Sequence, residues 1–226
     1  MIPNKQGAEF RIEKVNRMQA LGAVIWKPTL VPYVEMKVEK DGKVLTHINK
    51  LCESFNRNFF NLLTVFHGRK MGSGASFGSG YLTHRLYNGT IGGAWVNDTT
   101  TNASTGSILS GIVLGTGTTA ESFEHYALQT TIAHGNTSGT LAYQAQAAPS
   151  HTWTVGTLTW ELDHVRVFNN NSGGLITINE ICLIYYLPNS GAVYLMVLRD
   201  LLAVGVDVPD AAQLTVTYHL QMVFPE

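Results

Sequence analysis

The second half of the chain consists of short segments in which apolar and polar residues alternate. From residue 107 onward, turn-forming clusters such as Asn169-Asn170-Asn171-Ser172-Gly173-Gly174 separate these segments, and no helical stretch connects them. The clearest alternation runs through 157–162 and 215–224, where every second residue is apolar. A period of two leaves one face of a strand in water and buries the other. The expected strands cover 108–114, 140–145, 157–168, 176–186, 193–198 and 214–224.

Strands at this spacing, with no helical crossovers between them, are typical of antiparallel sandwiches and barrels. We therefore expect a mainly β fold: an antiparallel β-sandwich, jelly-roll-like, with one amphipathic helix and an extended N-terminal arm. A chain of 226 residues can bury roughly 70% of the surface that its unfolded form exposes, so this body needs no disulfide to fold. Cys52 and Cys182 lie in apolar runs, and we interpret both as small buried hydrophobes.

The first 110 residues are organised differently. Residues 34–40 alternate strictly up to Asp41-Gly42, and alternation around Asp-Gly predicts a β-hairpin. Residues 51–66 carry apolar residues at helical spacing, which predicts an amphipathic helix with Asn49 as its N-cap. The expected organisation is an arm, hairpin and helix over 1–70, Gly-, Ser- and Thr-rich loops over 71–110, and the sandwich body over 111–226.

Charge is scarce and unevenly distributed. Charged residues make up 14% of the chain, against roughly 25% in ordinary soluble proteins, so the outer faces are polar but uncharged or are covered by other subunits. Residues 1–70 hold 12 of the 15 Lys and Arg but 6 of the 16 Asp and Glu, a net charge of +6, and residues 71–226 carry −7. A basic arm and an acidic body can pair between neighbouring copies, whereas the overall charge of −1 argues against a nucleic-acid-binding protein. The candidate assembly-interface residues are Phe10, Arg11, Lys14, Arg17, Trp26, Phe55 and Phe59.

The stretch Gly115-Thr116-Gly117-Thr118-Thr119-Ala120 fits the loose dinucleotide-binding pattern G-x-G-x-x-A, and an apolar run precedes it. That pattern binds a pyrophosphate where a strand leads into a helix within a parallel βαβ unit. No long helix and no parallel strand are expected after this stretch. We therefore interpret it as a turn that closes a strand, with Phe123, Tyr126 and Leu128 packing back on the sheet.

No other group of residues predicts an enzyme. The eight histidines are scattered, with no H-x-x-x-H spacing and no Cys beside them. Glu161 and Asp163 share one face of an expected strand, and we interpret them as its solvated side rather than as a hydrolytic pair. We therefore expect no catalytic, cofactor-binding or metal-binding residues. We also expect no membrane-spanning segment and no signal peptide.

Trp95 and Trp153 are the remaining candidates for a ligand contact. Exposed aromatic rings can form a platform for sugar rings, although the aromatic residues of a sandwich more often belong to its core. Both tryptophans are therefore candidate contacts to a host-surface glycan.

The order of motifs in the C-terminal half resembles a group of tailed-bacteriophage virion structural proteins, including parts of capsid-decoration, head-fibre and tail proteins. The segments that carry the resemblance are, in order, GIVLGTGTTAESFEHYAL, TIAHG, a Leu-Ala-Tyr strand, RVFNNNSGGLITINEICLIYY, VYLMVLRDLL and VDVPDAAQLTVTYHLQMVF. Two positions depart from the pattern of the group. Cys182 stands where Gly is usual, and Asp210-Ala211-Ala212 replaces a Gly-containing turn before the last strand.

The resemblance implies a β-sandwich that assembles in the virion and has no active site. It implies other copies of the chain, and major capsid, neck or tail proteins, as partners. From the sequence itself we expect no membrane partner, and we favour self-association of the basic arm over contact with nucleic acid. Such a protein is made in the bacterial host cytoplasm and ends up in the virion. We favour a capsid-associated minor or decoration protein that assembles through its N-terminal arm. The alternatives are a tail, neck or fibre component, or a glycan-binding module of the virion.

Overall fold

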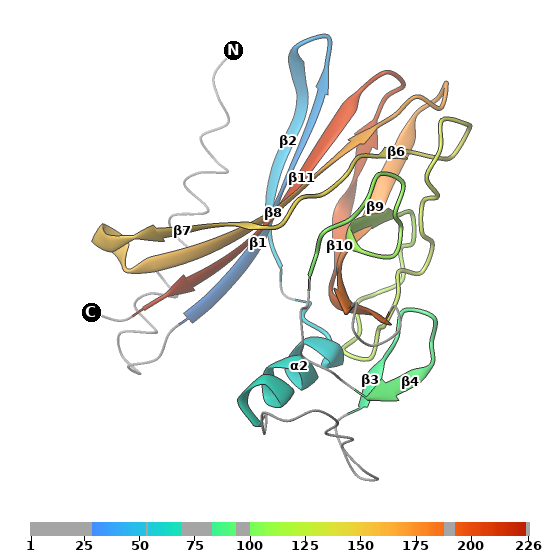
Figure 1. The fold of residues 1–226 in the computed structure, drawn as a ribbon. Coiled ribbons are helices and arrows are strands. Elements are labelled where there is room, and N and C mark those ends of the chain that lie inside the picture. Colours follow the sequence, from blue (N-terminus) through green and yellow to red (C-terminus); the bar gives the residue numbers. More distant parts are fainter. Residues whose placement is uncertain (1–28, 53, 69–82, 94–99, 188–192, 225–226) are drawn as a thin grey trace.

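A computed structural model of the chain describes residues 29–52, 54–68, 83–93, 100–187 and 193–224 (Figure 1). The described elements, in chain order, are β1 (Thr29–Lys40), β2 (Lys43–Leu51), α2 (Arg57–Gly68), β3 (Thr83–Arg85), β4 (Ile91–Gly93), β5 (Gly111–Gly115), β6 (Ala142–Tyr143), β7 (Ser150–Thr154), the single 3-10 turn η1 (Val155–Thr157), β8 (Thr159–Asn169), β9 (Ile176–Leu187), β10 (Val193–Val208) and β11 (Gln213–Val223).

Two antiparallel sheets form the body. The larger sheet has the strand order β2–β1–β11–β8–β6, and β7 pairs with the same edge of β8 as β6 does. The smaller sheet has the order β10–β9–β5, and a short β3–β4 hairpin lies beside α2 (Figure 1). The mainly β fold with antiparallel sheets and a helix, expected from the alternating pattern, is confirmed.

The core lies between the two sheets and follows from the period of two. Val34 and Met36 of β1 and Val216 of β11 alternate with less buried neighbours, are fully buried and belong to the core cluster. Ile112 and Ile181 belong to the same hydrophobic cluster from the side of the smaller sheet. Cys52 and Cys182 are both buried and unpaired, as their apolar surroundings in the sequence predict.

Residues 29–51 belong to the larger sheet. β1 lies between β2 and β11 and pairs with β11 from Thr29↔Val223 to Glu39↔Gln213. The predicted hairpin is confirmed, and its turn at Asp41-Gly42 has positive φ angles of 51° and 72°. The expected boundary at residue 70 does not separate an N-terminal unit from the sheet. β1 lies before this boundary and β11 lies after it, and the two strands pair with each other. Residues 1–28 of the predicted arm lie outside the described residues.

The helix begins later than the sequence predicts. Its expected range was 51–66 with Asn49 as the N-cap, but Asn49 lies in β2 and α2 begins at Arg57. Asn56 is the residue that caps the helix, since its side-chain oxygen accepts a hydrogen bond from the Phe59 N–H at 3.3 Å. Residues 54–56 instead run along β10: Phe55 forms a bridge with Leu198, and Asn56 donates from its side chain to Met196 O at 2.7 Å. Backbone pairing with β10 thus replaces the first helical turn. Among the described residues no helix is both long and apolar enough to cross a bilayer.

A buried ion pair explains the Gly-Thr-Gly stretch. Glu180 of β9 is fully buried and accepts hydrogen bonds from the N–H groups of Gly117 (3.1 Å) and Thr130 (2.8 Å), and from Arg199 Nε of β10 (2.8 Å). A Cβ atom at Gly115 would lie 2.7 Å from the Glu180 side chain, and a Cβ atom at Gly117 would lie 2.4 Å from Glu180 Oε1. The glycines therefore allow the loop to close over a carboxylate of the chain itself. This geometry agrees with a turn that closes a strand rather than with a phosphate-binding loop.

The turn before the last strand keeps a left-handed residue. Ala211, which stands where the resembling group has Gly, has a φ of 60°. Its N–H donates to Asn170 O at 2.7 Å, and the N–H of Ala212 donates to Pro209 O at 3.1 Å. These backbone hydrogen bonds hold alanine in a conformation that glycine adopts more easily.

Two buried histidines make the fold sensitive to acid. His84 of β3 and His164 of β8 are each 1% exposed, and burial lowers the pKa of each to about 4. Neither ring nitrogen of His84 has a hydrogen-bond partner, and His164 has one, from Nδ1 to Thr101 Oγ1 at 2.9 Å. The unfolded chain binds protons at both histidines below about pH 6.5, while the folded chain does not. Stability is therefore expected to fall as the pH drops from 6.5 towards 4.

At pH 5 each of these histidines is expected to lower the free energy of unfolding by about 2 kcal/mol relative to pH 7, because one pKa unit corresponds to about 1.4 kcal/mol. Urea unfolding of the full chain at both pH values measures the difference. His84→Leu should reduce the loss by about half, since it removes one of the two groups. His151→Gln, which changes an exposed histidine of β7, serves as the control. If His84→Leu loses as much free energy of unfolding between pH 7 and pH 5 as the wild type does, His84 is not a source of the acid sensitivity.

Candidate assembly surface

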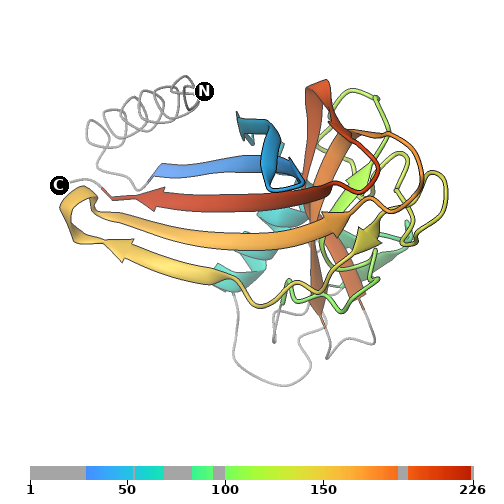
Figure 2. The ribbon, with the colours of Figure 1, turned by 90° about the horizontal axis from the view of Figure 1, so that it is seen from above.

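The larger sheet extends beyond the smaller one. Its far end, here called the sheet extension, comprises residues 29–33 of β1, 219–223 of β11, 159–163 of β8 and 150–154 of β7. It projects to the left of the body in Figures 1 and 2, whereas β9 and β10 lie over the other end of the sheet. Within the described part of the chain, the sheet extension is therefore a single layer.

An apolar row crosses the core-side face of the sheet extension. Cross-strand pairing places Leu30 opposite Met222, Met222 opposite Trp160, and Trp160 opposite Trp153. The hydrophobic core cluster reaches Leu220 and Leu162 in the preceding row but includes none of these four side chains. Trp153 is 48% exposed, and its ring contacts Phe224 edge-on at 5.7 Å between centroids. Leu30, Met222 and Trp160 are half-buried, so the core face continues outward as an apolar row whose exposed end is Trp153.

The opposite face of the sheet extension is polar. His219 of β11 lies opposite Tyr33 of β1 and Asp163 of β8, and the Tyr33 ring stacks on the imidazole at 4.2 Å. His219 Nδ1 is 2.6 Å from Asp163 Oδ1 and 3.6 Å from Glu161 Oε1. Burial of His219 opposes its charged form, but the hydrogen bond to Glu161 and the charge of Asp163 outweigh it and raise the pKa of His219. Glu161 and Asp163 share a face, as the alternation predicts, but both are half-buried rather than fully solvated, and the buried His219 lies beside them.

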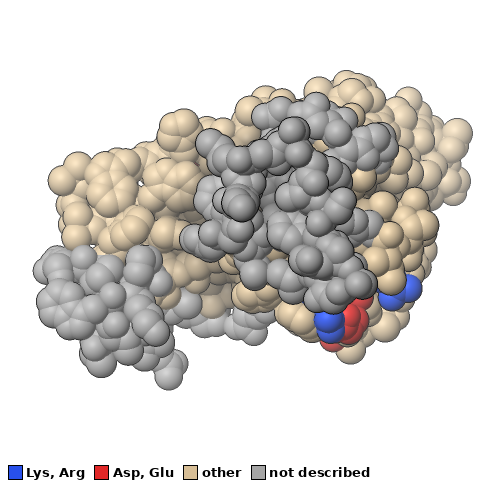
Figure 3. Space-filling view, turned by 60° about the horizontal axis from the view of Figure 1, so that its bottom comes forward, with Lys and Arg blue, Asp and Glu red and all other residues tan. Residues whose placement is uncertain are grey.

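A second group of aromatic rings lies on helix α2 and on the segment just before it. Phe55 and Phe59 stack at 3.9 Å and pack against the core, so both are half-buried. Phe60 is 47% exposed, and its ring lies 5.8 Å from that of Phe123, which is also exposed. The part of this face that Figure 3 describes shows few charged atoms. The assignment of Phe55 and Phe59 to an interface stays a prediction.

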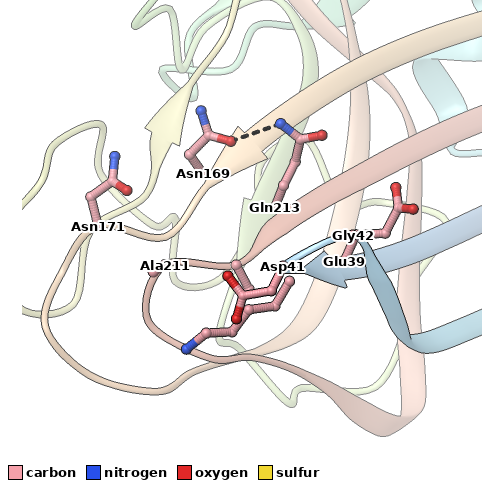
Figure 4. A pocket seen from close by; sticks show the side chains of 9 residues that line it. Glu39, Asp41, Gly42, Asn169, Asn171, Ala211 and Gln213 are labelled. Carbon is pink, nitrogen blue, oxygen red and sulfur yellow. Dashed lines mark hydrogen bonds between the residues drawn. The ribbon is translucent and has the colours of Figure 1, made fainter.

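A groove of about 430 Å³ lies at the other end of the larger sheet (Figure 4). It is bordered by the β1–β2 turn, the β10–β11 turn and the start of the β8–β9 loop. Asn169 and Gln213 hydrogen-bond to each other across it at 3.1 Å, and Lys40 Nζ donates to Asp210 O at 2.8 Å. These polar groups tie the turns together, and no aromatic ring lines the groove.

The remaining predicted site residues lie outside the described residues. They are Phe10, Arg11, Lys14, Arg17 and Trp26 of the candidate interface, and Trp95 of the candidate glycan contact. Leu30 and Met222 of the apolar row, and His219 of the polar face, are residues that the sequence analysis did not select. The alternation of 215–224 indicates which of them share a face. It carries no signal that this part of the strand extends past the second sheet.

No protein-family model, curated protein or solved structure matches the chain. The resemblance of the C-terminal half to virion structural proteins therefore stays a prediction.

Proposed function

We propose that the chain is a non-enzymatic structural protein of a tailed-bacteriophage virion, which assembles with copies of itself and with other virion proteins. The observation that carries the proposal is the apolar row Leu30–Met222–Trp160–Trp153 on the sheet extension, over which neither β9 nor β10 lies (Figure 1). Isolated exposed hydrophobes are common on monomers, but a row that continues the core face across four strands is typical of an interaction surface. The order of motifs in the C-terminal half and the low charge of the chain support the same function.

The basic N-terminal residues supply the second half of the proposed contact. Residues 1–28 contain five Lys and Arg and two Asp and Glu, whereas residues 71–226 carry a net charge of −7. Such complementarity favours contact between the N-terminus of one copy and the body of the next. Since β1 begins at Thr29 and is a central strand of the larger sheet, a truncation that keeps the sheet intact has to end at or before residue 28. Among virion locations we favour a capsid-associated one, with a tail, neck or fibre position as the alternative.

Trp153→Asp is expected to weaken self-association at least about tenfold, because it places a charge in the apolar row and interfacial tryptophans often dominate binding energy. Light scattering after size exclusion, over a range of protein concentrations, measures the mass of the full chain and of the variant. Val204→Asp is the matched control, since Val204 is 82% exposed on β10. A chain lacking residues 1–28 should also form oligomers with fewer copies while remaining folded.

An equal number of copies per particle for the wild type, Trp153→Asp and the truncated chain would contradict self-assembly through these surfaces. A folded wild type that is monomeric at every concentration would have the same consequence. The proposal would then require a different virion protein as the binding partner of the apolar row.

A glycan-binding module of the virion is the second candidate, and the exposure of the Trp153 ring favours it. An exposed indole can stack on a sugar ring. A glycan array probed with the full chain should then give a signal that Trp153→Ala abolishes. A blank array with folded protein would count against this function.

A further inference from the structure

We propose that the polar face of the sheet extension binds a divalent transition-metal ion through Glu161, Asp163 and His219. This inference does not depend on the proposed virion function. The three side chains come from the adjacent strands β8 and β11, where cross-strand pairing sets His219 opposite Asp163. One potential ligand atom from each of the three lies within 4.8 Å of the other two. Ligand atoms around one ion at about 2.0–2.2 Å from each must lie this close together.

The arrangement around His219 matches that of a metal-binding histidine. Its Nδ1 is directed towards Asp163 Oδ1 at 2.6 Å and Glu161 Oε1 at 3.6 Å. Its other nitrogen, Nε2, lies 3.4 Å from Glu35 Oε2 of β1. Histidines that bind metals commonly direct their second nitrogen to a carboxylate, which fixes the tautomer and strengthens the metal bond. An ion at Nδ1 would leave the ring proton on Nε2, facing Glu35.

A buried atom beside the cluster points independently to a ligand. Gln221, the next residue after His219 on the same face of β11, is 8% exposed, and its Oε1 has no hydrogen-bond partner. Its Nε2 donates to Glu161, so the amide group lies against the proposed ligands. A buried polar atom without a partner is rare because it carries a desolvation cost. A water molecule on a bound ion would provide a partner for Gln221 Oε1.

The cluster is also held in place before any ion binds. The Tyr33 ring stacks on the imidazole with an angle of 11° between the planes, and its hydroxyl donates to Glu161 Oε2 at 3.3 Å. Gln221 Nε2 donates to the same oxygen, and His47 Nε2 lies 2.6 Å from Glu35 Oε1. Supporting hydrogen bonds of this kind orient metal ligands and raise affinity.

The ligand types identify the class of ion. One imidazole and two carboxylates suit zinc, manganese, iron(II) or cobalt, whereas calcium and magnesium prefer shells made only of oxygen. The ion would link β8 to β11 within the sheet extension. Its function there would be structural, because binding to the folded state alone raises stability.

Calorimetric titration of the full chain, freed of metal by a chelator, tests the proposal with zinc chloride and manganese chloride. We expect one ion per chain, with calcium and magnesium at least about tenfold weaker because imidazole is a poor ligand for them. Asp163→Asn and Glu161→Gln keep the shape of the side chain and should each weaken zinc binding at least about tenfold. His151→Gln is the matched control, since His151 is an exposed histidine on the adjacent strand β7 that faces the other side of the sheet.

Thermal unfolding in metal-free buffer shows whether each variant is folded. A further measurement needs no variant: manganese added to the wild type should broaden the amide signals of 161–163 and 219–221 before any others. The absence of both heat and broadening would overturn the proposal. Zinc binding that is unchanged in both carboxylate variants, or that is lost in His151→Gln, would overturn it as well.

Discussion

Replacing Arg166 by methionine is expected to lower the free energy of unfolding by about 3–5 kcal/mol. Arg166 of β8 is fully buried, and its guanidinium donates to backbone carbonyls at Ser110 (3.0 Å), Ile112 (2.7 Å), Gln144 (3.0 Å) and Ser107 (2.8 Å). In the described part of the chain no carboxylate pairs with it, and burial lowers its pKa to about 10. The side chain therefore holds the loop that leads into β5 through carbonyls alone.

Methionine fills a similar volume but offers no donor, so these buried carbonyls would lose their partners. Each buried polar group left without a partner costs about 1–3 kcal/mol. Urea unfolding followed by tryptophan fluorescence measures the loss. Arg57→Met is the control, because Arg57 pairs with Glu124 at the exposed surface, where an ion pair contributes about 0–1 kcal/mol. A loss in Arg166→Met as small as that of the control would show that the carbonyls find other donors.

Glu180→Gln is expected to cost about 3–5 kcal/mol of stability, because it leaves the Arg199 guanidinium buried without its counter-charge. Arg199 is 2% exposed, and besides Glu180 it donates to Thr119 O at 2.9 Å. Glutamine keeps the shape but presents an amide group to the N–H donors of Gly117, Gln129 and Thr130. The variant should therefore weaken two contacts: the hydrogen bonds that hold the loop over residues 116–130, and the link between β9 and β10.

The double variant Glu180→Gln/Arg199→Met is the matched comparison for this pair. Removing both charges leaves no buried unpaired ion, so the double variant should lose less stability than the sum of the two single variants. Hydrogen exchange at the amides of 116–130 locates the change, since protection should drop there first. Strictly additive losses in the cycle would contradict a direct interaction between the two side chains.

The alternating pattern predicted three long strands of the two sheets, but it ended β10 at residue 198 instead of Val208 and gave no sign of β3 and β4 within the expected loops. Expected strands 157–168, 176–186 and 214–224 correspond to β8, β9 and β11 within a few residues at each end. The helix pattern predicted α2 but misplaced its start, because the bridge between Phe55 and Leu198 is a long-range contact that sequence periodicity does not contain. The strand β7 was missed since its sequence, SHTWT, is short and its residues are all exposed.

The candidate sites depended more strongly on tertiary structure. The exposed indole of Trp153 is one of the residues selected from the sequence, but Leu30 and Met222 join it through pairings of β1 with β11 and of β11 with β8. The polar cluster unites Glu35 with His219, which lie at opposite ends of the chain. No spacing rule relates such residues, because the register of distant strands decides which side chains meet.

The sequence by itself determined the mainly β class, the hairpin at Asp41-Gly42 and the burial of both cysteines. Each of these follows from local alternation, turn chemistry or apolar neighbours. Only the tertiary structure decided that the larger sheet extends beyond the smaller one. It alone also decided that the buried carboxylate of Glu180 lies against Gly115 and Gly117. The physical reason is that local patterns fix which face of a strand is apolar, whereas the lengths over which distant strands pair fix what covers that face.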